Sequence, residues 1–110
     1  AVSVLVANRQ AAVLHRALAG RLAEARALLT DPRGVLPADG ELLRRFDPDG
    51  LAELVAAAGL RAELLQGDGV VADAVADGGD GELAAFELAA AETSPLREIA
   101  ARLHVLARRR

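Results

Sequence analysis

The feature of the sequence that most constrains the fold is a short apolar, β-branched run near its beginning. Residues 2–7, Val-Ser-Val-Leu-Val-Ala, are apolar at nearly every position rather than at every second one. A strand with one face in water alternates apolar and polar residues, whereas a strand covered on both faces reads as a continuous apolar run. The run therefore predicts an internal strand of an α/β sheet.

Helical spacing follows this strand. Apolar residues recur on one face from Arg9 to Leu18 and again from Leu22 to Leu29, with Gly20 between them. This pattern predicts either one bent helix or two short ones. The proline and glycine residues of segment 30–40 then predict a loop.

A second helix has clear start and stop signals. Asp47 can cap the free N–H groups of a helix, Pro48 suits the first helical position, and Gly59 suits a left-handed ending. Residues 60–66 begin with an alternation of apolar and polar residues, which predicts a strand that turns at residues 67–69.

The last part of the chain repeats the order of helix and strand. An alanine-rich helix is expected over about residues 81–92, a short helix after Ser94-Pro95, and a last strand over residues 104–108. Strands alternating with helices place the chain in the α/β class. Three strands are few for a free-standing α/β domain, so we expect residues 1–110 to be a single partial domain whose sheet continues upstream.

Composition excludes several classes of site. The chain has no Cys, so a disulfide framework and a thiolate zinc site are both absent, and its two histidines lie far apart in sequence. We therefore predict no metal site. No run reaches the roughly 20 apolar residues of a membrane span, and we expect a cytoplasmic protein with no membrane partner.

Motifs for catalysis or cofactor binding are absent, so no catalytic or cofactor-binding residue is assigned. In open α/β sheets, ligands lie beyond the carboxyl ends of the strands. Asn8 and Arg9 follow the first strand and Asp73 follows the second, and His104 joins them if the last strand runs antiparallel. These four residues are the candidate rim. The alternative is structural: a helix cap, a solvated arginine, a turn residue and a packed histidine.

Six segments resemble class I S-adenosylmethionine-dependent methyltransferases, and more narrowly the tRNA carboxymethoxyuridine methyltransferase group. The resemblance is carried by residues 2–9, 17–20, 45–47, 57–60, 67–73 and 103–108. It implies the C-terminal portion of a Rossmann-like fold, with a three-strand mixed sheet whose last strand is antiparallel and central. It also implies that the S-adenosylmethionine motifs belong to an N-terminal half that this chain does not contain.

The resemblance implies a function for an intact parent enzyme: methyl transfer from S-adenosylmethionine, with this part alone inactive. The methyl acceptor stays open between a small molecule and an RNA nucleoside, because Gly69 and Val71 stand where tRNA-modifying members carry an arginine and a phenylalanine. The expected partner is the missing N-terminal half. The alternative function is a non-catalytic interaction module that pairs through an exposed sheet edge.

Overall fold

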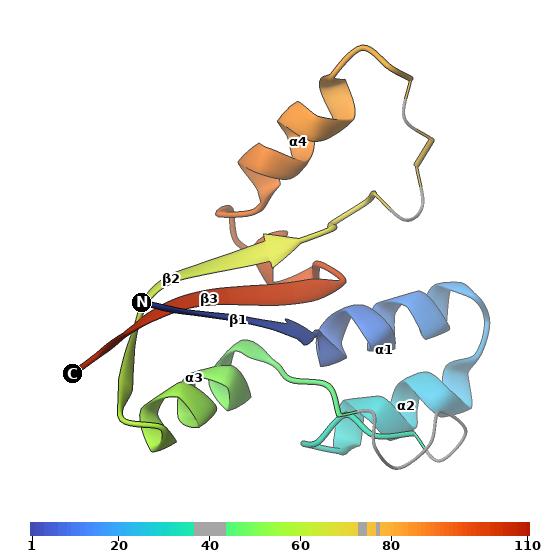
Figure 1. Cartoon of the computed structure of the whole chain (residues 1–110). Coiled ribbons are helices and arrows are strands. Elements are labelled where there is room, and N and C mark those ends of the chain that lie inside the picture. Colours follow the sequence, from blue (N-terminus) through green and yellow to red (C-terminus); the bar gives the residue numbers. More distant parts are fainter. Residues whose placement is uncertain (37–43, 73–74, 77) are drawn as a thin grey trace.

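The computed structural model describes residues 1–36, 44–72, 75–76 and 78–110, and within them the chain forms one three-stranded sheet with four α-helices. The elements follow one another in this order: β1 Val2–Ala7, α1 Arg9–Leu18, α2 Leu22–Thr30, α3 Pro48–Ala57, β2 Leu60–Asp68, α4 Glu82–Ala90, the short 3-10 helix η2 Arg97–Ile99, and β3 Arg102–Arg109. Figure 1 shows α1 and α2 side by side beyond one end of the sheet and α4 extending away from it. The α/β class is confirmed.

The strands lie in the order β1-β3-β2, and β3 is antiparallel to both neighbours. The prediction of a central, antiparallel last strand is thus confirmed. The prediction of a mixed sheet is wrong for this chain, because β1 and β2 do not pair with each other and every neighbouring pair is antiparallel. The long connection through α1, α2 and α3 gives β1 and β2 the same direction, and β3 separates them.

One face of the sheet is packed against α3. Leu51 and Val55 of this helix are buried against Leu103, Val105 and Ala107 of the central strand. The start of α3 follows its predicted signals, since the Asp47 carboxylate accepts a hydrogen bond from the Gly50 N–H at 2.8 Å and Pro48 is the first helical residue. This helix therefore supplies the main core.

The opposite face of the sheet is open. Leu5 on this face is 57% exposed, and Ser3 is exposed beside it. We expected β1 to be covered on both faces; among the described residues only the α3 face has a helix packed on it. The apolar run indicates a strand that is covered on both faces, and the described residues cover one of them.

Segment 9–29 forms two short helices, which is one of the two expected alternatives. Two boundaries differ from the expected ones: β2 continues through Asp68, and β3 begins at Arg102, two residues before His104. The early start of β3 also limits the helix expected after Pro95 to the single turn of η2, because Ala100 is already extended. The loop expected over residues 30–40 is described only through residue 36, where it is non-helical after Thr30.

No helix in the described part of the chain is long and apolar enough to cross a membrane.

Candidate functional site

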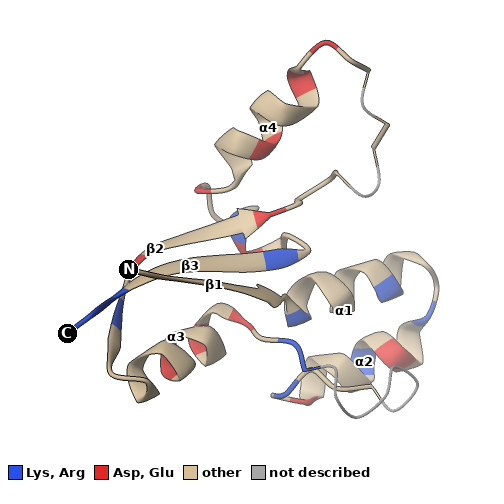
Figure 2. Ribbon diagram, in the orientation of Figure 1, with Lys and Arg blue, Asp and Glu red and all other residues tan. Residues whose placement is uncertain are grey.

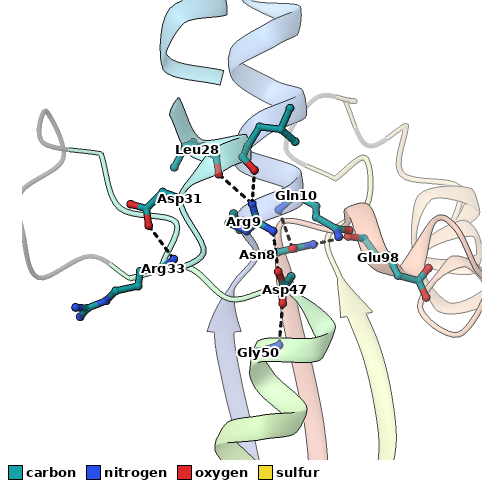
Figure 3. Close-up of polar contacts among 10 residues, drawn as sticks. Asn8, Arg9, Gln10, Leu28, Asp31, Arg33, Asp47, Gly50 and Glu98 are labelled. Carbon is teal, nitrogen blue, oxygen red and sulfur yellow. Dashed lines mark hydrogen bonds and ion pairs between the residues drawn. The ribbon is translucent and has the colours of Figure 1, made fainter. Parts of the chain in front are cut away.

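Asn8 lies at the end of β1, and its side chain is committed to the fold. It is 2% exposed, and its Oδ1 accepts from the Gln10 N–H at 3.1 Å, which caps α1. Its Nδ2 donates to the carbonyl oxygen of Glu98 at 2.8 Å (Figure 3) and to that of Ala100 at 2.7 Å. Asn8 thus ties the junction of β1 and α1 to the segment that enters β3.

Arg9 connects three helices. One guanidinium nitrogen donates to the carbonyl oxygens of Leu28 and Leu29, both at 3.0 Å, near the C-terminal end of α2. The other pairs with the Asp47 carboxylate at 2.8 Å, at the start of α3 (Figure 3). The side chains of Arg9 and Asp47 are only 16% and 22% exposed, so this ion pair is better shielded from water than a surface pair.

The electrostatics of Asp47 follow from these contacts. Burial raises the pKa of its carboxyl, but the hydrogen bond from the Gly50 N–H and the hydrogen bond and charge of Arg9 outweigh burial, so the pKa of Asp47 is lowered overall. The carboxylate is held in its charged form. Asp47 was predicted as a helix cap; its ion pair with Arg9 could not be read from local sequence, since the two residues lie 38 positions apart.

His104 lies on the open face of the sheet, between Ser3 and Gln66. Its Nε2 is 2.5 Å from the Ser3 hydroxyl, and its Nδ1 is 3.2 Å from Oε1 of Gln66. With the amide in this orientation, Nδ1–H of His104 donates to Gln66, and the Ser3 hydroxyl, which can both donate and accept, partners Nε2 in either protonation state.

A bulge in β2 positions Gln66 beside His104. The register of β2 against β3 shifts between Ala62 and Leu64, so that Glu63 is an extra residue. Before the shift, even-numbered residues of β2 share the α3 face; after it, Gln66 faces the open side and Leu65 packs into the core. Local sequence gives no signal for this change beyond the adjacent leucines.

The structure brings only part of the predicted rim together. Asn8 and Arg9 are adjacent, but each is engaged in contacts that hold the fold. His104 is the third residue of β3 rather than the first, and its side-chain partners are Ser3 and Gln66. Asp73 lies outside the described residues.

At the strand ends themselves, a different pair takes the position expected for His104. Arg102 of β3 lies opposite Ala7 of β1 on one side and opposite Asp68 of β2 on the other. Its guanidinium donates to the Asp68 carboxylate at 2.7 Å, and both side chains are largely exposed. Sequence patterns did not predict this pair, because they placed the start of the last strand two residues too late.

A cavity of about 540 Å³ adjoins the open face of the sheet. Leu5, Gln66 and His104 line its sheet side, and Ala84, Leu88 and Ala91 line the side formed by α4 and its end. Of the candidate rim residues that the structure describes, His104 is the one that borders this cavity. Among the described residues, no group of three or more His, Cys, Asp or Glu side chains could hold a metal ion.

Comparison with known proteins adds no relative: no family model matches the chain, and no curated protein matches it.

Proposed function

We propose that the chain is the C-terminal, substrate-side part of an S-adenosylmethionine-dependent methyltransferase. The observation that supports this proposal best is the strand order β1-β3-β2, with the last strand antiparallel in the middle. The family that the sequence resembles inserts its last strand in this way between the two strands before it. In this order β1 and β2 are consecutive in the chain but separated by β3, whereas consecutive strands are more often neighbours.

The residues of this chain do not fit the cofactor. In the family, S-adenosylmethionine lies on a glycine-rich loop after the first strand and an acidic residue after the second. The resemblance covers only the family's last three strands, so neither motif falls within this chain, and the Asn8 and Arg9 side chains that follow β1 are both used within the fold. The proposal therefore assigns cofactor binding to an upstream half of the domain and expects no methyl transfer from residues 1–110 alone.

Calorimetric titration of S-adenosylmethionine tests this assignment. The ligand would be titrated into the 110-residue chain and into a protein extended upstream along its reading frame. Binding to the extended protein alone supports the proposal. Binding to neither protein, or an upstream sequence without a strand followed by a glycine-rich turn, overturns it.

The proposed methyl acceptor is a small molecule or an RNA nucleoside. When the cationic side chains of a protein neutralise RNA phosphates, the counterions bound to the RNA are released. The affinity for RNA therefore falls steeply as salt is added. Titration of tRNA into the extended protein at several salt concentrations therefore separates the two acceptor classes. Tight, strongly salt-dependent binding selects RNA.

A second candidate function is an interaction module that pairs through the outer edge of β1. Phe46 hydrogen-bonds to Ala7 on this edge at 2.8 Å, and by the alternation of a strand the backbone groups of Ser3 and Leu5 point the same way. The strand carries no charged residue that would discourage pairing. A defined homodimer of the 110-residue chain in light scattering favours this function, and a monodisperse monomer counts against it.

A further inference from the structure

Three side chains on the open face of the sheet form a hydrogen-bonded row that no sequence motif predicted. Each comes from a different strand: Ser3 from β1, His104 from β3 and Gln66 from β2. The Ser3 hydroxyl lies 2.5 Å from Nε2 of His104, and Nδ1 of His104 lies 3.2 Å from Oε1 of Gln66. A hydroxyl beside an imidazole whose second nitrogen is held by a third group is the geometry of a nucleophile, its base and the residue that orients the base.

Glu92 fixes the direction of this row. Nε2 of Gln66 donates to the Glu92 carboxylate at 3.4 Å. A carboxylate only accepts, so this contact turns the amide oxygen of Gln66 toward His104, where it accepts from Nδ1–H. In the neutral imidazole the lone pair is then on Nε2, and the Ser3 hydroxyl donates to it. Proton transfer from Ser3 to His104 therefore needs no rearrangement of either side chain.

The backbone of β1 supplies a donor for the oxyanion that forms when a hydroxyl attacks a carbonyl group. Phe46 pairs with Ala7 on the outer edge of β1, and by the alternation of a strand the N–H of Ser3 points to the same edge. In serine hydrolases the N–H of the nucleophile itself is one of the oxyanion donors. Ser3 thus carries both a hydroxyl that can attack and an N–H that can stabilise the oxyanion.

The surroundings of Ser3 favour an uncharged acyl ester as the substrate. β1 has no charged residue, and the arginines of β3 are at its two ends (Figure 2). Leu5 follows Ser3 on the same face, about 7 Å along the strand. Leu5 and His104 both line the cavity of about 540 Å³. An acyl chain that starts at Ser3 can therefore run over Leu5 into this cavity, toward Leu88 on its far wall.

We propose that Ser3 is a nucleophile toward short-chain acyl esters, with His104 as its general base and Gln66 as the residue that positions the base. Ser3 Oγ bonds to the acyl carbon while Nε2 of His104 takes the hydroxyl proton. The bond from the acyl carbon to the ester oxygen breaks, and the alcohol leaves with that proton. Water then attacks the acyl-serine and gives a proton to His104, which returns it to Ser3 as the carboxylic acid is released. This inference does not depend on methyl transfer.

A fluorophosphonate probe tests the nucleophile, because an activated serine oxygen displaces its fluoride and bonds to phosphorus. The chain offers an internal control in Ser94, its other serine. Ser94 is also exposed, but its hydroxyl contacts Glu98 and Arg97 rather than a histidine. We expect peptide mass spectrometry to find at least about tenfold more probe on Ser3 than on Ser94. Equal labelling of the two serines, or labelling of neither, overturns the proposal.

Substitutions of His104 and Gln66 test the base and its orientation. His104→Gln should slow labelling of Ser3 at least about tenfold, since a positioned base contributes a factor of about 10²–10⁴. His15→Gln is the control, because His15 belongs to α1 rather than to the sheet. Gln66→Leu should slow labelling several-fold, and Gln66→Glu should restore it, because a carboxylate oxygen also accepts from Nδ1–H. An unchanged rate in His104→Gln overturns the proposal, and equal rates in the two Gln66 variants overturn the role of Gln66.

Release of p-nitrophenol from its acetate and butyrate esters tests the substrate class. We expect acylation to be several-fold faster with the butyrate, because its longer chain covers apolar surface at Leu5 and Leu88. Leu88→Ala should remove this preference. Leu18→Ala should keep it, because Leu18 on α1 is equally exposed at 77% but lies outside the cavity. A preference for the acetate, or release that Ser3→Ala leaves unchanged, overturns the proposal.

Discussion

Asn8 offers the sharpest test of the structure, because its side chain was expected at a ligand-binding rim and instead holds two elements together. Asn8→Ala removes the cap of α1, which costs about 1 kcal/mol. It also removes the donor to the carbonyls of Glu98 and Ala100, at about 1 kcal/mol each. We expect the free energy of unfolding to fall by about 3 kcal/mol.

A second substitution separates the cap from the two carbonyl contacts. Asn8→Asp keeps an oxygen for the Gln10 N–H but replaces the amide donor with a carboxylate facing the carbonyls of Glu98 and Ala100. If the cap alone mattered, this variant would match the parent protein. We expect it to be at least as destabilised as Asn8→Ala, since a carboxylate next to two carbonyl oxygens is repelled.

Urea denaturation followed by circular dichroism measures both variants. Gln10→Ala is the control, because Gln10 is exposed and the cap uses only its backbone N–H. That control should stay within about 0.5 kcal/mol of the parent. An Asn8→Ala protein that is equally close to the parent would refute a structural role for Asn8 and return it to the candidate rim.

Three further predictions concern the ion pair, the core and a tight turn. The pKa of Asp47 is lowered from 3.8 on folding, so its carboxylate stabilises the fold above that pH, and the contribution is lost as pH falls through the lowered value. Asp47→Asn should therefore make the free energy of unfolding fall less steeply as the pH is lowered through the acid range. An unchanged dependence on pH would contradict the role of the ion pair. Leu103→Ala, at a fully buried position of β3, should cost about 2–5 kcal/mol in urea denaturation. Gly34→Ala should lower the melting temperature clearly more than Gly20→Ala does. Both glycines have positive φ, but a Cβ at Gly34 would lie 2.7 Å from the Cβ of Arg45, whereas a Cβ at Gly20 would have nothing within 4 Å.

Much of the fold could be predicted because its signals are local. The bounds of β1 and the start of α3 follow from residues within a few positions of each element, and both are confirmed. The order of the strands was expected from the family resemblance rather than from any pattern in the residues. The start of β3 was wrong by two residues because the pairing of Arg102 with Asp68 and Ala7 decides it, and that pairing is long-range.

The candidate site was less accessible to prediction than the fold. Placing Asn8 and Arg9 at a strand end was sound, but a strand end does not reveal whether a polar side chain is free or used within the fold. The Arg9 guanidinium is not free, because it donates to a carbonyl oxygen of α2 and pairs with the carboxylate of Asp47 at the start of α3. His104 was singled out as a rim residue and does border a cavity, yet its partners Ser3 and Gln66 were not predicted.

By itself the sequence determined the α/β class, the local helix caps and the strand that needs cover on both faces, because these depend on residue periodicity and on hydrogen bonds between near neighbours. Only the tertiary structure decided which surfaces are buried and which polar groups are hydrogen-bonded within the chain. The bulge at Glu63 turns Gln66 toward His104, and the amide of Asn8 donates to carbonyl oxygens about 90 positions away. In the part of the chain that the structure describes, helix α4 and one face of the sheet are left without a covering element. The physical reason is the same: an apolar run indicates that a surface must be buried, while the packing of distant elements decides what buries it.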